Sequence, residues 1–96
     1  MKARILESKR AQKGLAKAPS EIVRAYEIWA RLVEDHGSGI LWEFKGYHNE
    51  KLSGVWEGHL SCRLNRKWRV IYSVDKQGHI EIVTVERVTP HDYRRN

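Results

Sequence analysis

Cysteine, proline and long apolar stretches are scarce in this chain of 96 residues. Cys62 is the one cysteine, so no disulfide can form within the chain, and no Cys/His spacing typical of a zinc site is present. No stretch approaches the roughly 20 apolar residues of a membrane span, and the start, MKARILESKR, lacks the apolar run of a signal peptide. We therefore expect a cytoplasmic protein that needs neither a metal nor a cofactor.

Positive charge is abundant. The chain has 18 Lys and Arg against 12 Asp and Glu, which gives a net charge of +6. Such an excess favours polyanionic partners: nucleic acid, an acidic protein segment or a membrane surface. The alternative is a solvated basic surface with no partner. Four Trp and four Tyr accompany a single Phe, so amphipathic rings must supply much of the core.

The first half predicts one strand and two helices. Ala3 to Leu6 form a short strand, and Ser8 is expected to cap a helix that runs to about Lys17. Pro19 ends this helix, because a residue before proline is disfavoured in the α region. Ser20 is expected to cap the second helix. Its buried face follows a period of 3.6 residues and consists of Ile22, Tyr26, Trp29 and Val33.

The second half changes to a period of two. Apolar residues alternate with polar ones over residues 60–65 and 68–74, which predicts two strands. A turn is expected over Asp75–Gly78, and a third strand from Ile80 to Val85 or Arg87. The order β-α-α-β-β-β predicts one α+β domain over residues 1–96, in which two N-terminal helices pack on one face of an antiparallel sheet.

Strand alternation also predicts a basic face. If Cys62 faces the helices, the arginines that flank the turn between the two strands emerge side by side on the opposite face, where they can hold a phosphate bidentately. The alternative is that they pair with Glu81 and Glu86 on the last strand. Four basic residues fall within these seven positions: Arg63, Arg66, Lys67 and Arg69.

Acid–base groups lie on both sides of these strands. His48 and Glu50 precede them, and His91 and Tyr93 follow in the tail. RNA cleavage by its own 2′-hydroxyl needs a base, a cation beside the phosphorane and an acid for the leaving oxygen. The loop, the sheet and the tail each supply one of these three groups if the tail folds back over the sheet. The alternative is that these loop and tail side chains are merely exposed.

A longer pattern points to a known family. The run from Glu50 to Tyr72, with Leu-x-Gly, Gly-x-x-Ser-x-Arg-Leu and Arg-Val-Ile-Tyr, resembles the RelE/ParE superfamily of type II toxins, especially the YoeB and YafQ branches. The ending from Glu86 to Arg94 is similar to that of the YafQ branch. The resemblance implies a RelE-like fold and a ribosome-dependent endoribonuclease, an mRNA interferase that needs no metal, cuts translated mRNA and inhibits protein synthesis.

The resemblance also implies roles for individual residues. Glu50 falls on the general base of the YoeB branch, and Arg69 on the arginine that stabilises the transition state. Arg63 falls on a functional residue of the sheet. His91 falls on the C-terminal general acid of YafQ-like toxins, and Tyr93 lies near their terminal aromatic residue, at a different spacing.

The sequence departs from the family at several positions. Lys67 stands where YafQ-like toxins have a catalytic aspartate, and only Lys51 and Lys67 remain of a lysine-rich site like that of RelE. His48 shares or replaces the role of Glu50. We expect low activity on free RNA and reliance on positioning by the ribosome. The residues expected to bind RNA are His48, Lys51, Arg66 and Lys67.

The expected partners are a cognate antitoxin, and the ribosome with its mRNA. A basic face invites an acidic, partly disordered antitoxin segment that folds on binding. Operator DNA is reached only through the antitoxin, no membrane is involved, and a homodimer stays open. One alternative is a ParE-like inhibitor of DNA gyrase, which shares the fold but does not need Glu50 or His91. Another is a non-catalytic RNA-binding domain, although the element order differs from that of a double-stranded RNA-binding domain.

Overall fold

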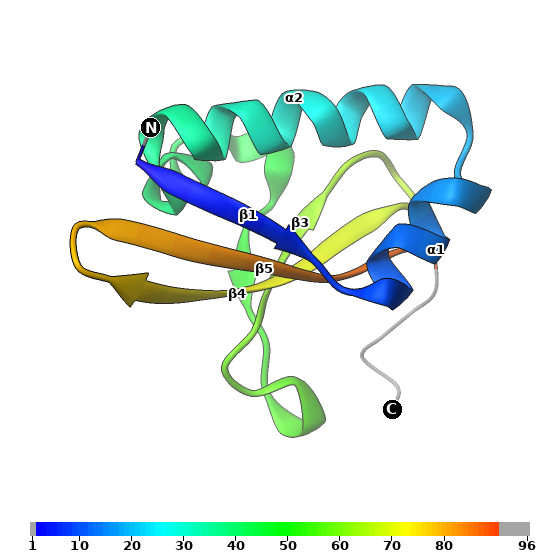
Figure 1. Cartoon of the computed structure of the whole chain (residues 1–96). Helices are drawn as coiled ribbons and strands as arrows, with labels where there is room; N and C mark the ends of the chain where they lie inside the picture. The colour runs from blue at the N-terminus through cyan, green and yellow to red at the C-terminus, as the bar shows by residue number, and fades with distance from the viewer. Residues whose placement is uncertain (1, 91–96) are drawn as a thin grey trace.

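Two helices cover one face of a five-stranded sheet in the computed structural model, which describes residues 2–90. Figure 1 shows α2 lying across this face. No helix within residues 2–90 is long and apolar enough to cross a bilayer. The elements in chain order are β1 (Ala3–Glu7), α1 (Lys9–Lys17), α2 (Ser20–His36), the 3-10 helices η1 (Ser38–Trp42) and η2 (Lys45–Tyr47), β2 (Glu50–Lys51), the 3-10 helix η3 (Gly54–Trp56), β3 (Leu60–Arg63), β4 (Arg69–Gln77) and β5 (Ile80–Thr89).

The sheet has the strand order β1-β5-β4-β3-β2. The expected α+β class and the order β-α-α-β-β-β are confirmed, with β2 as an additional short strand. The expectation of a purely antiparallel sheet is wrong, because β1 runs parallel to β5. Apolar alternation reveals that a segment is a strand but carries no information on its direction, and the helices between β1 and the other strands leave room for a parallel partner.

The two helices begin differently. The Ser8 side chain accepts a hydrogen bond from the Ala11 N–H at 3.0 Å, which confirms it as the cap of α1. Ser20 does not cap α2; it is the first helical residue, and Pro19 occupies the cap position. The Pro19 carbonyl accepts from the N–H of Ile22 at 2.9 Å, so the chain enters the helix directly from the extended proline.

The core lies between α2 and the helix-facing side of the sheet. Trp29 is completely buried at its centre, stacked on Tyr26 at 5.8 Å and packed edge-on against Tyr72 at 5.4 Å between ring centroids. All four helix residues expected to face inward are buried. The strands contribute Cys62, Val70, Tyr72, Val83, Val85 and Val88 to the same cluster.

The hairpin between β4 and β5 is tighter than the sequence suggests. Asp75 to Gln77 stay in the ladder, with Gln77 paired to Ile80, so the turn consists of Gly78 and His79 and the predicted start at Asp75 is wrong. Gly78 has a φ of 63°, the left-handed conformation that glycine adopts without steric cost. Two-residue loops match the twist of paired strands, which explains why the ladder extends so far.

α1 packs onto β5 through a glycine. A Cβ atom at Gly14 would lie 2.0 Å from the Val88 carbonyl oxygen, a backbone atom that cannot move aside without disturbing β5. We expect Gly14→Ala to lower the free energy of unfolding by roughly 1–3 kcal/mol, measured by urea denaturation. Gly46→Ala is the matched control, because no atom of residues 2–90 lies within 4 Å of a Cβ atom placed there. Equal stability of the two variants would contradict this packing.

Candidate functional site

The face of the sheet away from the helices carries the predicted arginines. Arg63 on β3 lies directly opposite Arg69 on β4, as strand alternation predicts. Because Cys62 and Val70 belong to the helix-side core, both arginines point to the other face. In the adjacent row, Glu50 on β2 is paired with Ser61, so its side chain emerges on that face too. The register therefore brings one carboxylate and two guanidinium groups onto one surface.

A third arginine reaches this face through a β-bulge. Arg87 is paired with Ile71, whereas the next residue of β4 is paired with Val85, so Glu86 is the extra residue. Without the bulge, Arg87 would follow Val85 on the helix side; with it, Val88 takes the core position and Arg87 faces the other way. The bulge carbonyl of Glu86 accepts a hydrogen bond from Ser8 Oγ at 2.8 Å. Strand alternation alone would put Arg87 on the helix side, so its place in the site cannot be predicted without the bulge.

The arrangement of the arginines is costly for the isolated chain. Like charges directly opposite each other on paired strands destabilise a sheet. In addition, Arg63 Nε is buried and has no hydrogen-bond partner within residues 2–90, and a buried donor without a partner costs free energy. An anion on this face, beside Arg63, would give the buried Nε–H a hydrogen-bond acceptor. The face is therefore suited to a phosphate group.

Glu50 is held in place by its neighbour. Asn49 Oδ1 accepts hydrogen bonds from the Tyr72 hydroxyl at 2.6 Å and from Cys62 Sγ at 3.3 Å, which fastens the start of β2 to the core side of β3 and β4. Glu50 faces the opposite side of the sheet, and His48, which has the left-handed conformation at the end of η2, places Nε2 3.9 Å from Glu50 Oε2. The two candidate bases of the sequence are thus adjacent.

The loop containing η3 covers part of the same face. Figure 1 shows it as the lime-green loop on the side of the sheet away from α2. The Arg87 guanidinium lies 5.3 Å from the centroid of the Trp56 ring, a cation–π contact, and His59 meets Trp56 edge-on at 5.2 Å. Trp56 and His59 form a wall beside Arg87, and sequence reasoning missed both, since irregular loops carry no periodic signal.

The remaining predicted residues lie around this surface or outside it. Lys51 is paired with Leu60, which packs on the core, so its side chain leaves on the opposite side from Glu50. Arg66 and Lys67 are exposed in the turn between β3 and β4. His91 and Tyr93 lie outside the described residues.

One alternative for the arginines can be tested directly. The Glu81 carboxylate accepts hydrogen bonds from the Ser38 N–H at 2.7 Å and from Ser38 Oγ at 3.1 Å. Glu81 therefore holds the start of η1, which accounts for an acidic residue at this position of β5. The alternative in which Glu81 pairs with the basic residues of β3 and β4 is therefore wrong.

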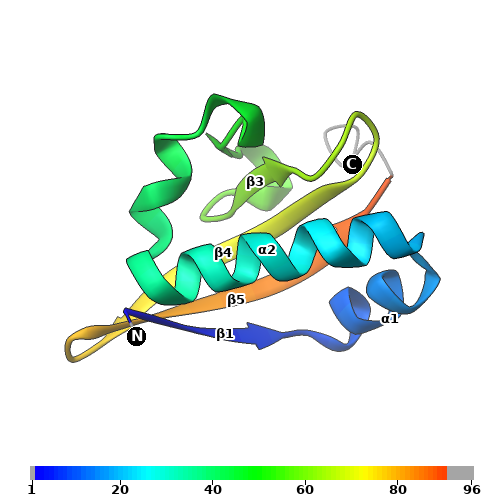
Figure 2. The ribbon, with the colours of Figure 1, turned by 90° about the horizontal axis from the view of Figure 1, so that it is seen from above.

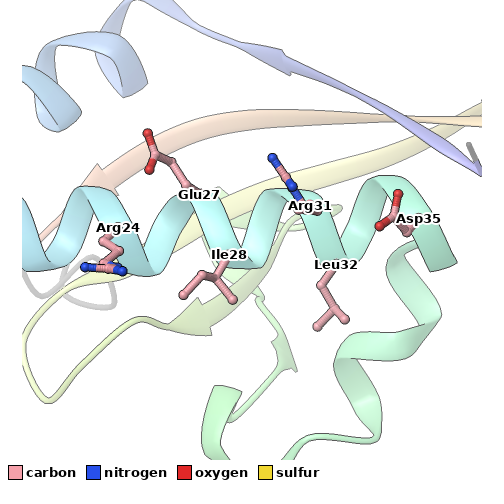
Figure 3. A pocket seen from close by; sticks show the side chains of 6 residues that line it. All are labelled: Arg24, Glu27, Ile28, Arg31, Leu32 and Asp35. Carbon is pink, nitrogen blue, oxygen red and sulfur yellow. The ribbon is translucent and has the colours of Figure 1, made fainter.

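A separate hollow of about 450 Å³ lies on the outer face of α2. Figure 3 shows that its side chains all come from this one helix. Its charged residues follow the spacing of ion pairs along a helix. No residue of the face that carries Glu50 lines this hollow. It does not bring chemistry from different elements together, so the helix-free face remains the candidate site. The lining residues are Arg24, Glu27, Ile28, Arg31, Leu32 and Asp35.

Neither a protein-family model nor a curated protein sequence matches the chain significantly, whereas several solved structures match its fold. The YoeB/ParE toxin from Agrobacterium tumefaciens superposes with a TM-score of 0.72 at 17% identity, covering 96% of this chain and 100% of that one. YafQ from E. coli strain BL21(DE3) gives 0.73 at 16%, covering 92% of each. YoeB from the heterotetrameric YoeB–YefM complex of Staphylococcus aureus gives 0.70 at 19%, covering 96% and 100%. The chain thus has the RelE-like fold.

The core thiol beneath the site gives a prediction about alkaline pH. Burial raises the pKa of Cys62 from 9.0 to about 11, against smaller opposing effects of hydrogen bonds with Trp29 and Tyr72. The folded protein therefore keeps the proton between these values while the unfolded chain loses it, so the free energy of unfolding falls as pH rises through this window. We expect Cys62→Ala to show a shallower fall in urea denaturation across this range. An equal fall in both proteins would contradict the assignment.

Proposed function

We propose that this chain is the toxin of a type II toxin–antitoxin pair, an endoribonuclease that cleaves translated mRNA on the ribosome and so inhibits protein synthesis in the cytoplasm. The observation that carries the proposal is the convergence of Glu50, Arg63, Arg69 and Arg87 on one face of the sheet. The RelE-like fold shared with YoeB and YafQ supports it. Fold alone does not determine activity, which depends on the residues of the site.

The chemistry proposed for this face is attack by the RNA on itself. Glu50 removes the proton of a 2′-hydroxyl, whose oxygen attacks the adjacent phosphorus, and the 5′-oxygen leaves with a proton from a general acid. The products are a 2′,3′-cyclic phosphate and a 5′-hydroxyl. Arg63 and Arg69 stabilise the negative charge on the phosphorane. His91 is the proposed acid, and Tyr93 assists in the tail.

The residues around the arginines suit a substrate that is held by a larger assembly. His48 lies close enough to Glu50 to share a proton through water, and Arg66 and Lys67 extend positive charge along the turn. A phosphate chain can cross this turn toward the arginines, but an open sheet face does not by itself align the reacting phosphate of a flexible RNA with Glu50. The ribosome supplies the missing alignment.

An antitoxin is the second proposed partner. YoeB of Staphylococcus aureus is known in complex with YefM, and YafQ of E. coli in complex with DinJ. By analogy, an acidic segment of the antitoxin lies on the arginine face of this chain and competes with RNA for it. The same analogy extends to a homodimer, since a YoeB dimer of Staphylococcus aureus is also known.

The first test is the effect of Arg69→Ala in cells. Induction of the wild-type chain should produce codon-phased cuts in translated transcripts, seen by mapping RNA 5′ ends. We expect Arg69→Ala to reduce cutting by roughly 100-fold or more, because one fixed donor to the transition state is lost. Arg10→Ala is the matched control on exposed α1 and should cut normally. Intact transcripts with broken chromosomes would instead indicate a gyrase inhibitor. In that case the Glu50→Ala variant would remain toxic, because a gyrase inhibitor does not need this carboxylate.

The second test compares translated and free RNA. We expect the purified protein to cut a transcript on ribosomes far faster than the same transcript alone, since positioning by the ribosome supplies much of the rate. The readout is primer extension on both samples at equal RNA concentration. Comparable rates on the two substrates would contradict dependence on the ribosome.

A further inference from the structure

The segment that joins α2 to β2 exposes two large aromatic side chains. Trp42 is 53% exposed and Phe44 is 47% exposed. Figure 2 shows this green segment at the edge of the sheet opposite β1. Together with Leu41, Lys45, His48 and Asn49, the two rings line a hollow of about 340 Å³. This volume falls within the ~300–1,000 Å³ of sites that bind small ligands.

The aromatic residues are exposed on a firmly held support. Tyr47 packs on the core and meets the Phe44 ring edge-on, with 6.2 Å between centroids. Leu41 is completely buried beneath the hollow. The other end of the segment is fixed where Glu81 holds Ser38. The rings are therefore presented to solvent by a fixed backbone, and a pair of neighbouring exposed rings marks a binding surface more than scattered apolar residues do.

The hollow adjoins the candidate site through His48. This residue lines the hollow and its Nε2 atom lies 3.9 Å from Glu50 Oε2. Lys45 adds a positive charge on the same wall, while Glu43 is the exposed carboxylate of the segment. Aromatic rings interleaved with cations are the combination by which proteins bind single-stranded nucleic acid, stacking its bases and attracting its phosphates.

We propose that the hollow bounded by Trp42 and Phe44 is a stacking subsite for one base of single-stranded RNA, next to the nucleotide whose phosphate lies on the arginines. The inference rests on the proposed function for the identity of the ligand. His48 joins the two parts: it contacts the backbone between the stacked base and the phosphate at Glu50. Lys45 holds a phosphate outside the hollow. The subsite selects for an unpaired base, because a base within a duplex presents no free face for stacking.

The test uses a single-stranded RNA of about 12 nucleotides with 2′-O-methyl groups, which binds but cannot attack its own phosphate. Its affinity for the wild-type chain is measured by fluorescence anisotropy. We expect Trp42→Ala and Phe44→Ala each to weaken binding roughly tenfold or more, and Trp42→Phe to retain most of the affinity. Ile28→Ala is the control, because that side chain is 60% exposed on α2 and lines the hollow of Figure 3. This variant should bind the RNA as tightly as the wild-type chain does.

Salt dependence separates stacking from charge. Lys45→Ala should reduce the dependence of affinity on salt by about one phosphate contact, whereas Trp42→Ala should leave this dependence unchanged while lowering affinity. Unchanged RNA affinity in Trp42→Ala and Phe44→Ala would overturn the inference, and so would a wild-type chain that does not bind this RNA. Transcript mapping with Arg69→Ala tests the proposed function independently of these results. Loss of binding in the aromatic variants together with uncut transcripts would retain the subsite and reject the nuclease.

Discussion

The pairing of β3 with β4, which sets Arg63 directly opposite Arg69, is the constraint on which the candidate site depends. A slip of β4 by one residue would turn Arg69 toward the core and expose Val70, so the two arginines would no longer share a face. Packing prevents this, because the helix-facing side chains of these strands surround the buried Trp29. The core therefore does two things at once: it stabilises the fold, and it holds two like charges closer together than they would otherwise lie.

Other features of the fold serve the same surface. The bulge opposite Ile71 adds Arg87, and its carbonyl is satisfied by Ser8, so the cap of α1 also supports the site. Asn49 fastens β2 from the core side and leaves Glu50 on the arginine face. These contacts come from distant parts of the sequence. They explain how a sheet that ends in a two-residue strand can still present an ordered carboxylate.

Periodicity in the sequence predicted what depends on local pattern. The buried face of α2 and the neighbouring positions of Arg63 and Arg69 follow from apolar spacing alone. Periodicity did not predict features that depend on non-local or irregular geometry. These are the parallel pairing of β1 with β5, the extension of the ladder to Gln77, and the bulge that redirects Arg87. Trp42 and Trp56 lie in short 3-10 helices, and Phe44 lies between η1 and η2. None of these segments has a repeating pattern, so only the folded chain shows which surfaces the three rings line.

The most direct test of the central claim is the position of an RNA phosphate relative to these strands. The structure of this chain bound to a ribosome carrying an mRNA with a 2′-O-methyl group at the cut site would show it. We expect phosphate oxygens about 3 Å from the guanidinium groups of Arg63 and Arg69, with the modified 2′-oxygen beside Glu50. An mRNA that instead lies across α2, with the arginine face turned away from it, would contradict the account.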